Sequence, residues 1–325
     1  MASAEAVLAV IDAAGAHVPG LMDRLETRLL ELASTHGETL AGHAGSTISA
    51  GGKRLRPLLV FLAAGPPADD TAAERQLRCA VAVELVHSAT LVHDDVLDAA
   101  PLRRGRPTVF ASGGRLLATA TGDLLFAQSF TELARNGRAD AVRILSDASS
   151  ALAQGELLQR EDAWNVGVAR DRYLHRCELK TARLFSAACR LGALEAGGPA
   201  DVLGAFGRRI GLAFQILDDV LDVSGPAERT GKHRGTDLLD GTVTLPLIEA
   251  RERDASLAAL DLRAIDTPEQ AEAVCDRIAA TGALEAAREV ALAMVTEAKA
   301  ALPALPEGQQ GALELVADGV VDRYA

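Results

Sequence analysis

Aromatic residues are scarce in this 325-residue chain, at 3% of the sequence. Alanine and leucine abound instead, and the alternation of apolar and polar residues that marks β-strands is nearly absent. No Gly/Ser/Pro-rich or charge-run linker divides the chain near its middle. Because 49% of the residues are hydrophobic, a large core can form. These features predict an all-α fold, with residues 1–325 in a single large helical bundle.

Cysteine is also sparse, and no Cys-x-x-Cys pair occurs. We interpret the four cysteines as reduced, buried small residues of a cytoplasmic protein: Cys79, Cys177, Cys189 and Cys275. No apolar run reaches the roughly 18 residues that a membrane span requires, so we expect no transmembrane segment. The first five residues lack the basic start of a signal peptide.

Positive charge is in the minority: the net charge is −12 and the pI is about 5.1. This balance argues against a general nucleic-acid-binding protein, so we expect no nucleic-acid partner. It does not exclude a small anionic substrate, because local cations or bound metal can override the overall field.

Two acidic motifs stand out, Asp94-Asp95-x-x-Asp98 and Asp218-Asp219-x-x-Asp222, each set in an apolar run. On a helix, the first and last Asp of each motif lie on one face about one turn apart. Carboxylates at this spacing repel each other. A solvated acidic face would explain one such pair, but the repeat in apolar surroundings favours cation binding. His87, two turns before Asp94, shares the acidic face and is equally well explained as a core residue.

Basic clusters accompany these motifs at Gly51–Pro57, at Pro101–Thr108 and at Lys180-Thr181. A glycine pair before a helix start, with Lys and Arg beside it, resembles an anion site, although most basic loops are simply solvated. The arginines after the first acidic motif suit a metal-bound oligophosphate or a structural salt bridge. Carboxylate oxygens select Mg²⁺, which commonly bridges them to substrate phosphates. Since the intervening residues are Ala, Leu, Val and Thr, the reacting carbon skeleton should be apolar.

In chain order, these residues resemble the motifs of the all-trans isoprenyl (polyprenyl) diphosphate synthase family, of the geranylgeranyl or longer-chain type. The resemblance covers about residues 50–250 and rests on Gly52–Pro57, Glu84–His87, His93–Asp98, Leu102–Gly105, Pro107-Thr108, Lys180–Ala182, Phe214–Asp222, Gly231-Lys232 and Thr244–Pro246. It implies an isoprenoid-synthase bundle around a central cavity, and a Mg²⁺-dependent prenyltransferase. Such an enzyme condenses isopentenyl diphosphate head-to-tail with an allylic diphosphate (dimethylallyl, geranyl, farnesyl or geranylgeranyl) and releases pyrophosphate.

The resemblance also implies roles for single residues. Those expected in catalysis are Asp94, Asp95, Asp98, Arg103, Lys180, Asp218 and Lys232. The expected ligands of about three Mg²⁺ ions are Asp94, Asp98 and Asp218, with Asp95, Asp219 and Asp222 in support. The residues expected to hold the allylic diphosphate are Arg103, Lys180, Thr181, Gln215 and Lys232, and those for isopentenyl diphosphate are Lys53, Arg56, His87 and Arg104. A homodimer is implied as well.

The chain departs from the family pattern at two positions. Thr242 stands where Lys is common before Thr-Leu-Pro, and Leu179 stands where Gly is frequent before Lys180. Neither is an expected metal ligand, so we expect activity with altered allylic affinity.

Product length in such enzymes depends on what blocks the cavity below the first acidic motif. The relevant positions are Ala89 and Thr90, with Val86 a turn higher, and no aromatic residue lies between Cys79 and His93. We therefore expect a product of C20 or longer, although another helix or a second subunit can supply the block.

Four alternatives stay open from the sequence. A short-chain farnesyl or geranyl diphosphate synthase would share every motif. A class I terpene cyclase would lack the second Asp-rich motif and the Lys53-x-x-Arg56 pair, and a head-to-head synthase would carry a different acidic pattern. A regulatory subunit of a hetero-oligomeric synthase tends to lose acidic motifs, and both are intact here.

Overall fold

Helices account for almost all of the regular structure in the computed structural model, which describes residues 9–322 except 11, 36 and 226–232. The strands of this part form one antiparallel hairpin, in which Leu102 pairs with Pro107 and Arg103 with Arg106. Buried apolar side chains from Val10 to Val320 make one continuous hydrophobic core. The all-α prediction is confirmed.

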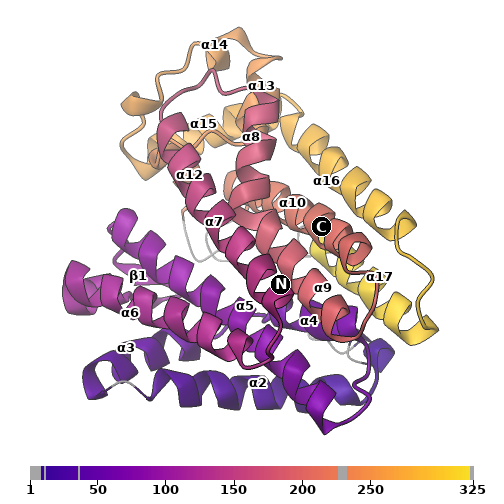
Figure 1. The fold of residues 1–325 in the computed structure, drawn as a ribbon. Helices are drawn as coiled ribbons and strands as arrows, with labels where there is room; N and C mark the ends of the chain where they lie inside the picture. Colours follow the sequence, from indigo (N-terminus) through magenta and orange to yellow (C-terminus); the bar gives the residue numbers. More distant parts are fainter. Residues whose placement is uncertain (1–8, 11, 36, 226–232, 323–325) are drawn as a thin grey trace.

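The elements follow one another as in Figure 1, with α5 and α10 running through the middle of the molecule. Their bounds are α2 His17–Ala33, α3 Glu38–Ser49, α4 Leu55–Ala64, α5 Asp70–Leu97, β1 Leu102–Arg103, β2 Arg106–Pro107, α6 Val109–Ala134, α7 Ala139–Asp162, α8 Arg170–Cys177, the π-helix η1 Glu178–Ala182, α9 Arg183–Glu195, α10 Ala200–Ser224, α12 Thr236–Leu239, α13 Leu245–Arg251, α14 Ala255–Ala258, the 3₁₀ turn η2 Leu262–Ala264, α15 Pro268–Ala280, α16 Ala283–Ala300 and α17 Glu307–Asp322.

Helix α5 carries the first acidic motif, and its N-cap lies two residues before the cap that its sequence suggests. A capping box at Thr71–Glu74 is the sequence expectation, but the side chain of Asp69 accepts from Ala72 N at 2.7 Å and forms the N-cap. Asp competes well with Thr as an N-cap, and it also favours the positive end of the helix dipole. The predicted capping box of α15 is confirmed, with Thr267 and Gln270 exchanging side-chain and backbone bonds.

Helix α2 runs through Pro19-Gly20, where the sequence suggests an interruption. The predicted interruption is wrong because Pro19 lies in the first turn of the helix, where its missing N–H costs no hydrogen bond.

Where α9 packs on α4, a glycine allows the two backbones to meet. A Cβ on Gly192 of α9 would lie 2.1 Å from Val60 O of α4, so this pair packs closely only because position 192 is Gly.

Two further glycines position η1, the short π-helix that carries Lys180 and Thr181. A Cβ on Gly155 of α7 would lie 2.6 Å from Lys180 N, and one on Gly211 of α10 would lie 2.7 Å from Ala182 Cα. The π-helix therefore packs directly between α7 and α10. Single π-turns of this kind often occur at functional sites.

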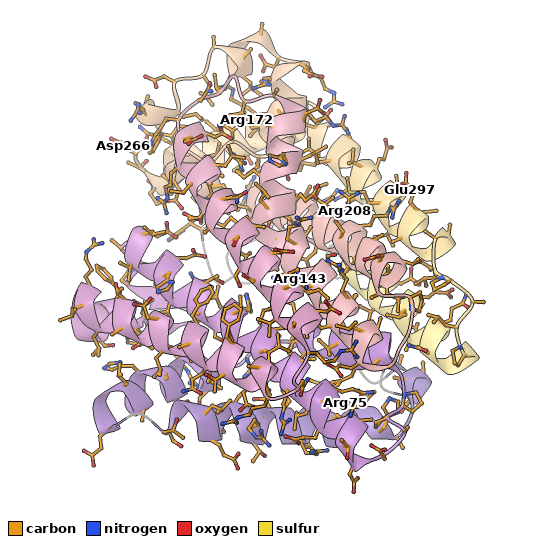
Figure 2. The ribbon with its side chains drawn as sticks, in the orientation of Figure 1. Arg75, Arg143, Arg172, Arg208, Asp266 and Glu297 are labelled. Carbon is orange, nitrogen blue, oxygen red and sulfur yellow. The ribbon has the colours of Figure 1, made fainter. Side chains whose placement is uncertain are left out.

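The outer surface is strongly charged. Among the charged residues labelled in Figure 2, Arg143 of α7 and Glu297 of α16 are exposed, and Arg208 of α10 is partly exposed. The four cysteines are buried, and each is a free thiol, as expected from the sequence. Over the described residues, no helix has the length and apolar character needed to cross a membrane. The cytoplasmic location stays a prediction.

Candidate active site

The first acidic motif occupies the last turns of α5. Asp94 is partly buried, and burial raises its pKa to about 6, reinforced by Glu156 and Asp98 and opposed by Lys180. Asp98, one turn later, is more exposed and binds Arg160 of α7, with Nη2 and Oδ1 at 2.5 Å. These two carboxylates thus face α7 at the end of α5.

Asp95 points elsewhere. It is buried, and its Oδ1 accepts from Arg103 Nε at 2.8 Å. Arg103 belongs to β1, so this bond ties the hairpin to α5. The hairpin is where the expected substrate arginines Arg103 and Arg104 lie, and Arg104 has a positive φ of 52° at its turn.

The second acidic motif lies at the end of α10. Asp218 and Asp222 are partly buried, and Asp222 Oδ2 accepts from Asp237 N at 3.2 Å. Asp219 is 5% exposed and accepts from Tyr173 and Gln215. Burial, reinforced by Asp237, raises the pKa of Asp219 to about 8. The three acids therefore have different surroundings, with Asp222 holding the segment that leads into α12.

Lys180 and Thr181 connect α7 with α10 across η1. Lys180 Nζ lies 2.5 Å from Glu156 Oε2 and 3.1 Å from Gln159 Oε1, both on α7. Thr181 donates its hydroxyl to Gln215 Oε1 of α10 at 2.6 Å. Burial alone would raise the pKa of Glu156, but Lys180 and Arg160 outweigh it and the net shift is downward. The structure thus brings together three of the residues expected at the allylic diphosphate: Lys180, Thr181 and Gln215.

The residues expected at the isopentenyl diphosphate gather beside α5. A Cβ on Gly52 would lie 3.1 Å from Arg104 Nη1, so the Gly51–Pro57 loop and the hairpin are in contact. The guanidinium of Arg56 lies 4.6 Å from the centre of the Phe185 ring, and burial lowers its pKa to about 10. Burial and the nearby arginines Arg56 and Arg104 hold the pKa of His87 well below its usual range. Lys53 is exposed at the edge of this cluster.

Arg54 belongs to the same loop but has a structural role. It is 7% exposed and binds Glu84 Oε1 at 2.7 Å and Glu26 Oε1 at 2.6 Å. Its φ is 46° at the N-cap of α4, a left-handed backbone conformation that turns the chain between Lys53 and Leu55. The cluster therefore contains one arginine that anchors and several that remain for a substrate.

The residues expected to control product length are small but packed. Ala89 and Val86 are fully buried, and Thr90 donates its hydroxyl to His87 O at 2.8 Å. One turn after Ala89, His93 stacks on Phe126 of α6, with ring centres 6.1 Å apart. An aromatic ring thus reaches this side of α5 from a neighbouring helix, as the sequence left open.

Three predicted positions need separate mention. Lys232 lies outside the described residues. Leu179 is buried in η1, where a side chain is accommodated although Gly is frequent in the family. Thr242 donates its N–H to Asp237 O at 2.7 Å, and the next residue, Val243, accepts at its carbonyl from Arg176 Nη2 at 2.5 Å. The buried Arg176 thus lies near Thr242, the position where Lys is common in the family.

Divalent metal fits the donor set, although in the described part of the chain no three His, Cys, Asp or Glu side chains converge on one point. Asp94 is a partly buried carboxyl whose raised pKa reflects unfavourable ionisation, and a divalent cation would relieve it. Its neighbour Asp98 offers a second carboxylate on the same face. Hard oxygen donors of this kind suit Mg²⁺ or Ca²⁺.

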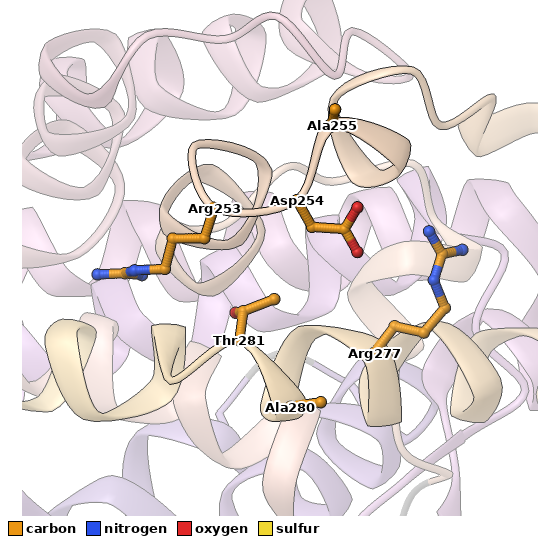
Figure 3. A pocket seen from close by; sticks show the side chains of 6 residues that line it. All are labelled: Arg253, Asp254, Ala255, Arg277, Ala280 and Thr281. Atoms are coloured by element: carbon orange, nitrogen blue, oxygen red, sulfur yellow. The ribbon is translucent and has the colours of Figure 1, made fainter.

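A surface hollow of about 520 Å³ lies elsewhere, in the region of α13–α15. Figure 3 shows Asp254 and Arg277 pointing toward each other and Arg253 pointing away. Thr281, Ala255 and Ala280 complete its lining, which contains no residue of either acidic motif. We assign it no part in the active site.

Sequence reasoning missed four residues of the site. Glu156, Gln159 and Arg160 of α7 reach Lys180 and Asp98, and Tyr173 of α8 reaches Asp219. The spacing of Glu156, Gln159 and Arg160, three and four residues apart, marks one helix face and could have indicated the first three. Tyr173 carries no such signal.

Comparison with known proteins decides the family. Residues 38–281 match the polyprenyl synthetase family. This chain belongs to the polyprenyl synthetase family. A geranylgeranyl diphosphate synthase from Methanosarcina mazei is 35% identical over 317 residues, covering 94% of this chain and 95% of that protein. The heptaprenyl diphosphate synthase component 2 of Geobacillus stearothermophilus is 44% identical over 216 residues, covering 66% of this chain and 67% of that protein.

A solved structure supports the same assignment for the fold. A polyprenyl synthase from Caulobacter crescentus, complexed with calcium and isoprenyl diphosphate, superposes with a TM-score of 0.88 at 34% identity. The match covers 97% of this chain and 98% of that chain. The predicted family and the isoprenoid-synthase bundle are confirmed.

Proposed function

We propose that this prenyltransferase condenses isopentenyl diphosphate head-to-tail with an allylic diphosphate and makes an all-trans polyprenyl diphosphate of C20 or longer. The observation that carries the proposal is the arrangement around η1. Lys180 and Thr181 lie between the acidic end of α5 and the acidic end of α10, with α7 closing the third side. Cations and carboxylates that separate helices bring to one region of the molecule suit a metal-bound diphosphate.

The allylic diphosphate occupies this region in our proposal. Asp94, Asp98 and Asp218 would hold Mg²⁺, about three ions by the family pattern, and the bound metal would supply positive charge to the leaving pyrophosphate. Asp98, which pairs with Arg160 in this structure, would be one of these ligands. Arg103, Lys180 and Lys232 supply positive charge to the diphosphate oxygens, and Thr181 and Gln215 supply hydrogen bonds. Two further carboxylates support this region: Asp95 holds Arg103, and Asp222 holds the segment that leads into α12.

Isopentenyl diphosphate occupies the basic cluster. Arg56 and Arg104 present guanidinium groups, Lys53 an ammonium group, and His87 a neutral imidazole. The lowered pKa values of Arg56 and Arg104 reflect burial without a full set of counter-charges, a deficit that a dianionic substrate would relieve. Arg54, held by Glu26 and Glu84, fixes the loop for this purpose.

The reaction follows from these two positions. The C1–O bond of the allylic substrate breaks, pyrophosphate leaves with the electron pair, and an allylic cation remains. The double bond of isopentenyl diphosphate attacks C1 of the allylic cation. Loss of one proton from C2 of the isopentenyl unit then restores a double bond. Fixed cations around the leaving group lower the barrier, and apolar walls protect the carbocation from water.

The product leaves along α5 toward Ala89, Val86 and Thr90 in our proposal, and chain growth stops where larger side chains block it. We also propose that residues 1–325 fold as one domain and that two copies form a homodimer. The relative named heptaprenyl diphosphate synthase component 2 is by its name one part of a larger synthase, so pairing with a different chain is the competing arrangement.

One assay tests the proposal: purified protein, Mg²⁺, labelled isopentenyl diphosphate and each of the four allylic primers. We expect incorporation of label into lipid-extractable product with at least one primer, and none after chelation of the metal. Conversion of a primer without isopentenyl diphosphate would identify a cyclase. No incorporation from any primer would contradict the proposal and favour a regulatory subunit or a cyclase.

A further inference from the structure

Asp219 is the buried member of the second acidic motif, and two side chains occupy both of its carboxylate oxygens. Tyr173 Oη donates to Oδ2 at 2.7 Å, and Gln215 Nε2 donates to Oδ1 at 2.8 Å. A carboxylate that accepts one bond at each oxygen is held in a single rotamer. Asp219 therefore serves as a fixed acceptor inside the protein.

The network continues from Asp219 to the surface of the candidate site. Because the Gln215 amide directs its N–H₂ group to Asp219, its carbonyl oxygen must face η1. Thr181 donates its hydroxyl to that oxygen at 2.6 Å. The orientation of the Gln215 amide, and with it that of the Thr181 hydroxyl, is thus set by Asp219.

Tyr173 forms the far end of the chain of bonds. Its ring is fully buried in α8, and its hydroxyl also contacts the thiol of Cys177. The guanidinium of Arg176 lies 5.4 Å from the ring centre and is itself held by Val243 O. A buried tyrosine hydroxyl needs a partner in any protein, so burial alone would not give Tyr173 a role in the reaction. The role of Tyr173 follows from its partner Asp219, because Asp219 orients the Gln215 amide.

We propose that Tyr173 is a positioning residue for prenyl transfer: through Asp219 it fixes Gln215 and Thr181 for the allylic diphosphate. This rests on the proposed function. Without the hydroxyl, Asp219 loses one of its two side-chain donors and can rotate, and the Gln215 amide is free to turn. The basic cluster at Arg56 and Arg104 is held by other elements, α4 and the hairpin, so isopentenyl diphosphate should be unaffected.

The test is Tyr173→Phe, which removes the hydroxyl and keeps the buried ring. We expect the KM for the allylic substrate to rise about tenfold, in keeping with the loss of one buried hydrogen bond. The KM for isopentenyl diphosphate should stay within about twofold. Binding of a non-reactive allylic thiodiphosphate, measured by calorimetry, should weaken by the same factor. Ser129→Ala is the matched control, because it removes a fully buried hydroxyl that donates only to Phe126 O.

A double-mutant cycle separates positioning from general damage. If Tyr173 acts through Gln215, then Tyr173→Phe should have little further effect on allylic KM in a Gln215→Ala background. Equal losses in both backgrounds, or parallel rises in the KM values of both substrates, would overturn the positioning role. An active wild-type enzyme with unchanged allylic KM in Tyr173→Phe would do the same and leave the proposed function intact. A wild-type protein without any prenyl transfer would overturn both.

Discussion

At the scale of single residues, Asp94 shows best how the site is prepared for a cation. Burial makes its ionised form unfavourable, and the negative charges of Glu156 and Asp98 add to this effect. Lys180 offsets part of the cost. Carboxyl groups with raised pKa values and named charge partners are common at functional sites. A divalent cation beside Asp94 would favour its ionised form and offset the cost of burying that charge.

Replacing Asp94 by Asn should abolish most of the activity. The amide keeps the size of the side chain but cannot supply the charge that holds a divalent cation. We expect kcat/KM to fall by about 100-fold or more, with an unchanged far-ultraviolet circular dichroism spectrum. Asp147→Asn is the control, because Asp147 is an exposed residue of α7, and this variant should retain activity. Activity within a few-fold of wild type in Asp94→Asn would remove Asp94 from the metal ligands.

His87 gives a pH-dependent signature of stability. Its pKa is lowered in the folded protein, first by burial and then by the nearby arginines, so the folded protein does not take up its proton. Below the unfolded pKa of about 6.5 the unfolded chain gains that proton, and stability is lost as the pH falls. Between about pH 7.5 and 5.5, wild type should lose about 1.4 kcal/mol more than His87→Asn. Guanidinium unfolding at both pH values measures this, and parallel losses would contradict it.

At the scale of elements, contacts between backbones decide where the functional groups lie. The π-helix η1 approaches α7 at Gly155 and α10 at Gly211, and this close approach brings Lys180 within reach of Glu156. A longer side chain at either glycine would separate the helices. The position of Lys180, the cation of η1, thus depends on glycines, which have no side chain.

Gly155→Ala should therefore destabilise the protein and weaken the allylic site together. Its Cβ would lie 2.6 Å from Lys180 N, a backbone atom that cannot move without moving η1. We expect a loss of about 2 kcal/mol in the free energy of unfolding, together with a higher allylic KM. Gly45→Ala in α3 is the control. A Cβ there meets nothing within 4 Å, so helix propensity should stabilise it by up to about 1 kcal/mol. Equal effects in the two variants would argue against close packing at Gly155.

Product length should respond to bulk on the α5 side that faces α6. Phe at Ala89, or at the less buried Thr90, would fill the path of the growing chain one turn from the His93–Phe126 stack. We expect shorter products, read by chromatography of the dephosphorylated alcohols. Ala153→Phe on the exposed face of α7 should leave the length distribution unchanged. An unchanged distribution in both Ala89→Phe and Thr90→Phe would refute the predicted path.

The sequence predicts the elements that have local signals and misses those that depend on tertiary contacts. The helices, the cap at Thr267 and the two acidic faces follow from spacing alone. The hairpin at Arg103 has only two residues per strand, too few for alternation to be visible. The partnership of Tyr173 with Asp219 joins positions 46 residues apart, which no local pattern reports. The sequence predicts the wrong N-cap for α5 because Asp69 and Thr71, two good cap residues, lie within one turn of each other.

At the scale of the whole molecule, apolar side chains remain exposed on neighbouring helices. Leu116 of α6 is 85% exposed and Leu157 of α7 is 66% exposed, although the chain carries a net charge of −12. Exposed leucines on a strongly acidic protein are consistent with the proposed homodimer.

Sedimentation equilibrium should therefore give a mass near twice the 33.8 kDa of one chain. Leu116→Glu places a charge on the exposed apolar surface of α6 and should shift the mass toward one chain at micromolar concentration. Leu292→Glu, on the 43%-exposed surface of α16, is the control and should not. A wild-type mass of one chain would contradict the homodimer and favour pairing with a different subunit.

The most direct test of the central claim is the ratio of pyrophosphate released to isopentenyl diphosphate consumed, measured with product length in one reaction. Head-to-tail condensation releases one pyrophosphate for each isopentenyl unit added. With farnesyl diphosphate and Mg²⁺ we predict a ratio of about one and products of 20 carbons or more. Pyrophosphate release without consumption of isopentenyl diphosphate would contradict the account.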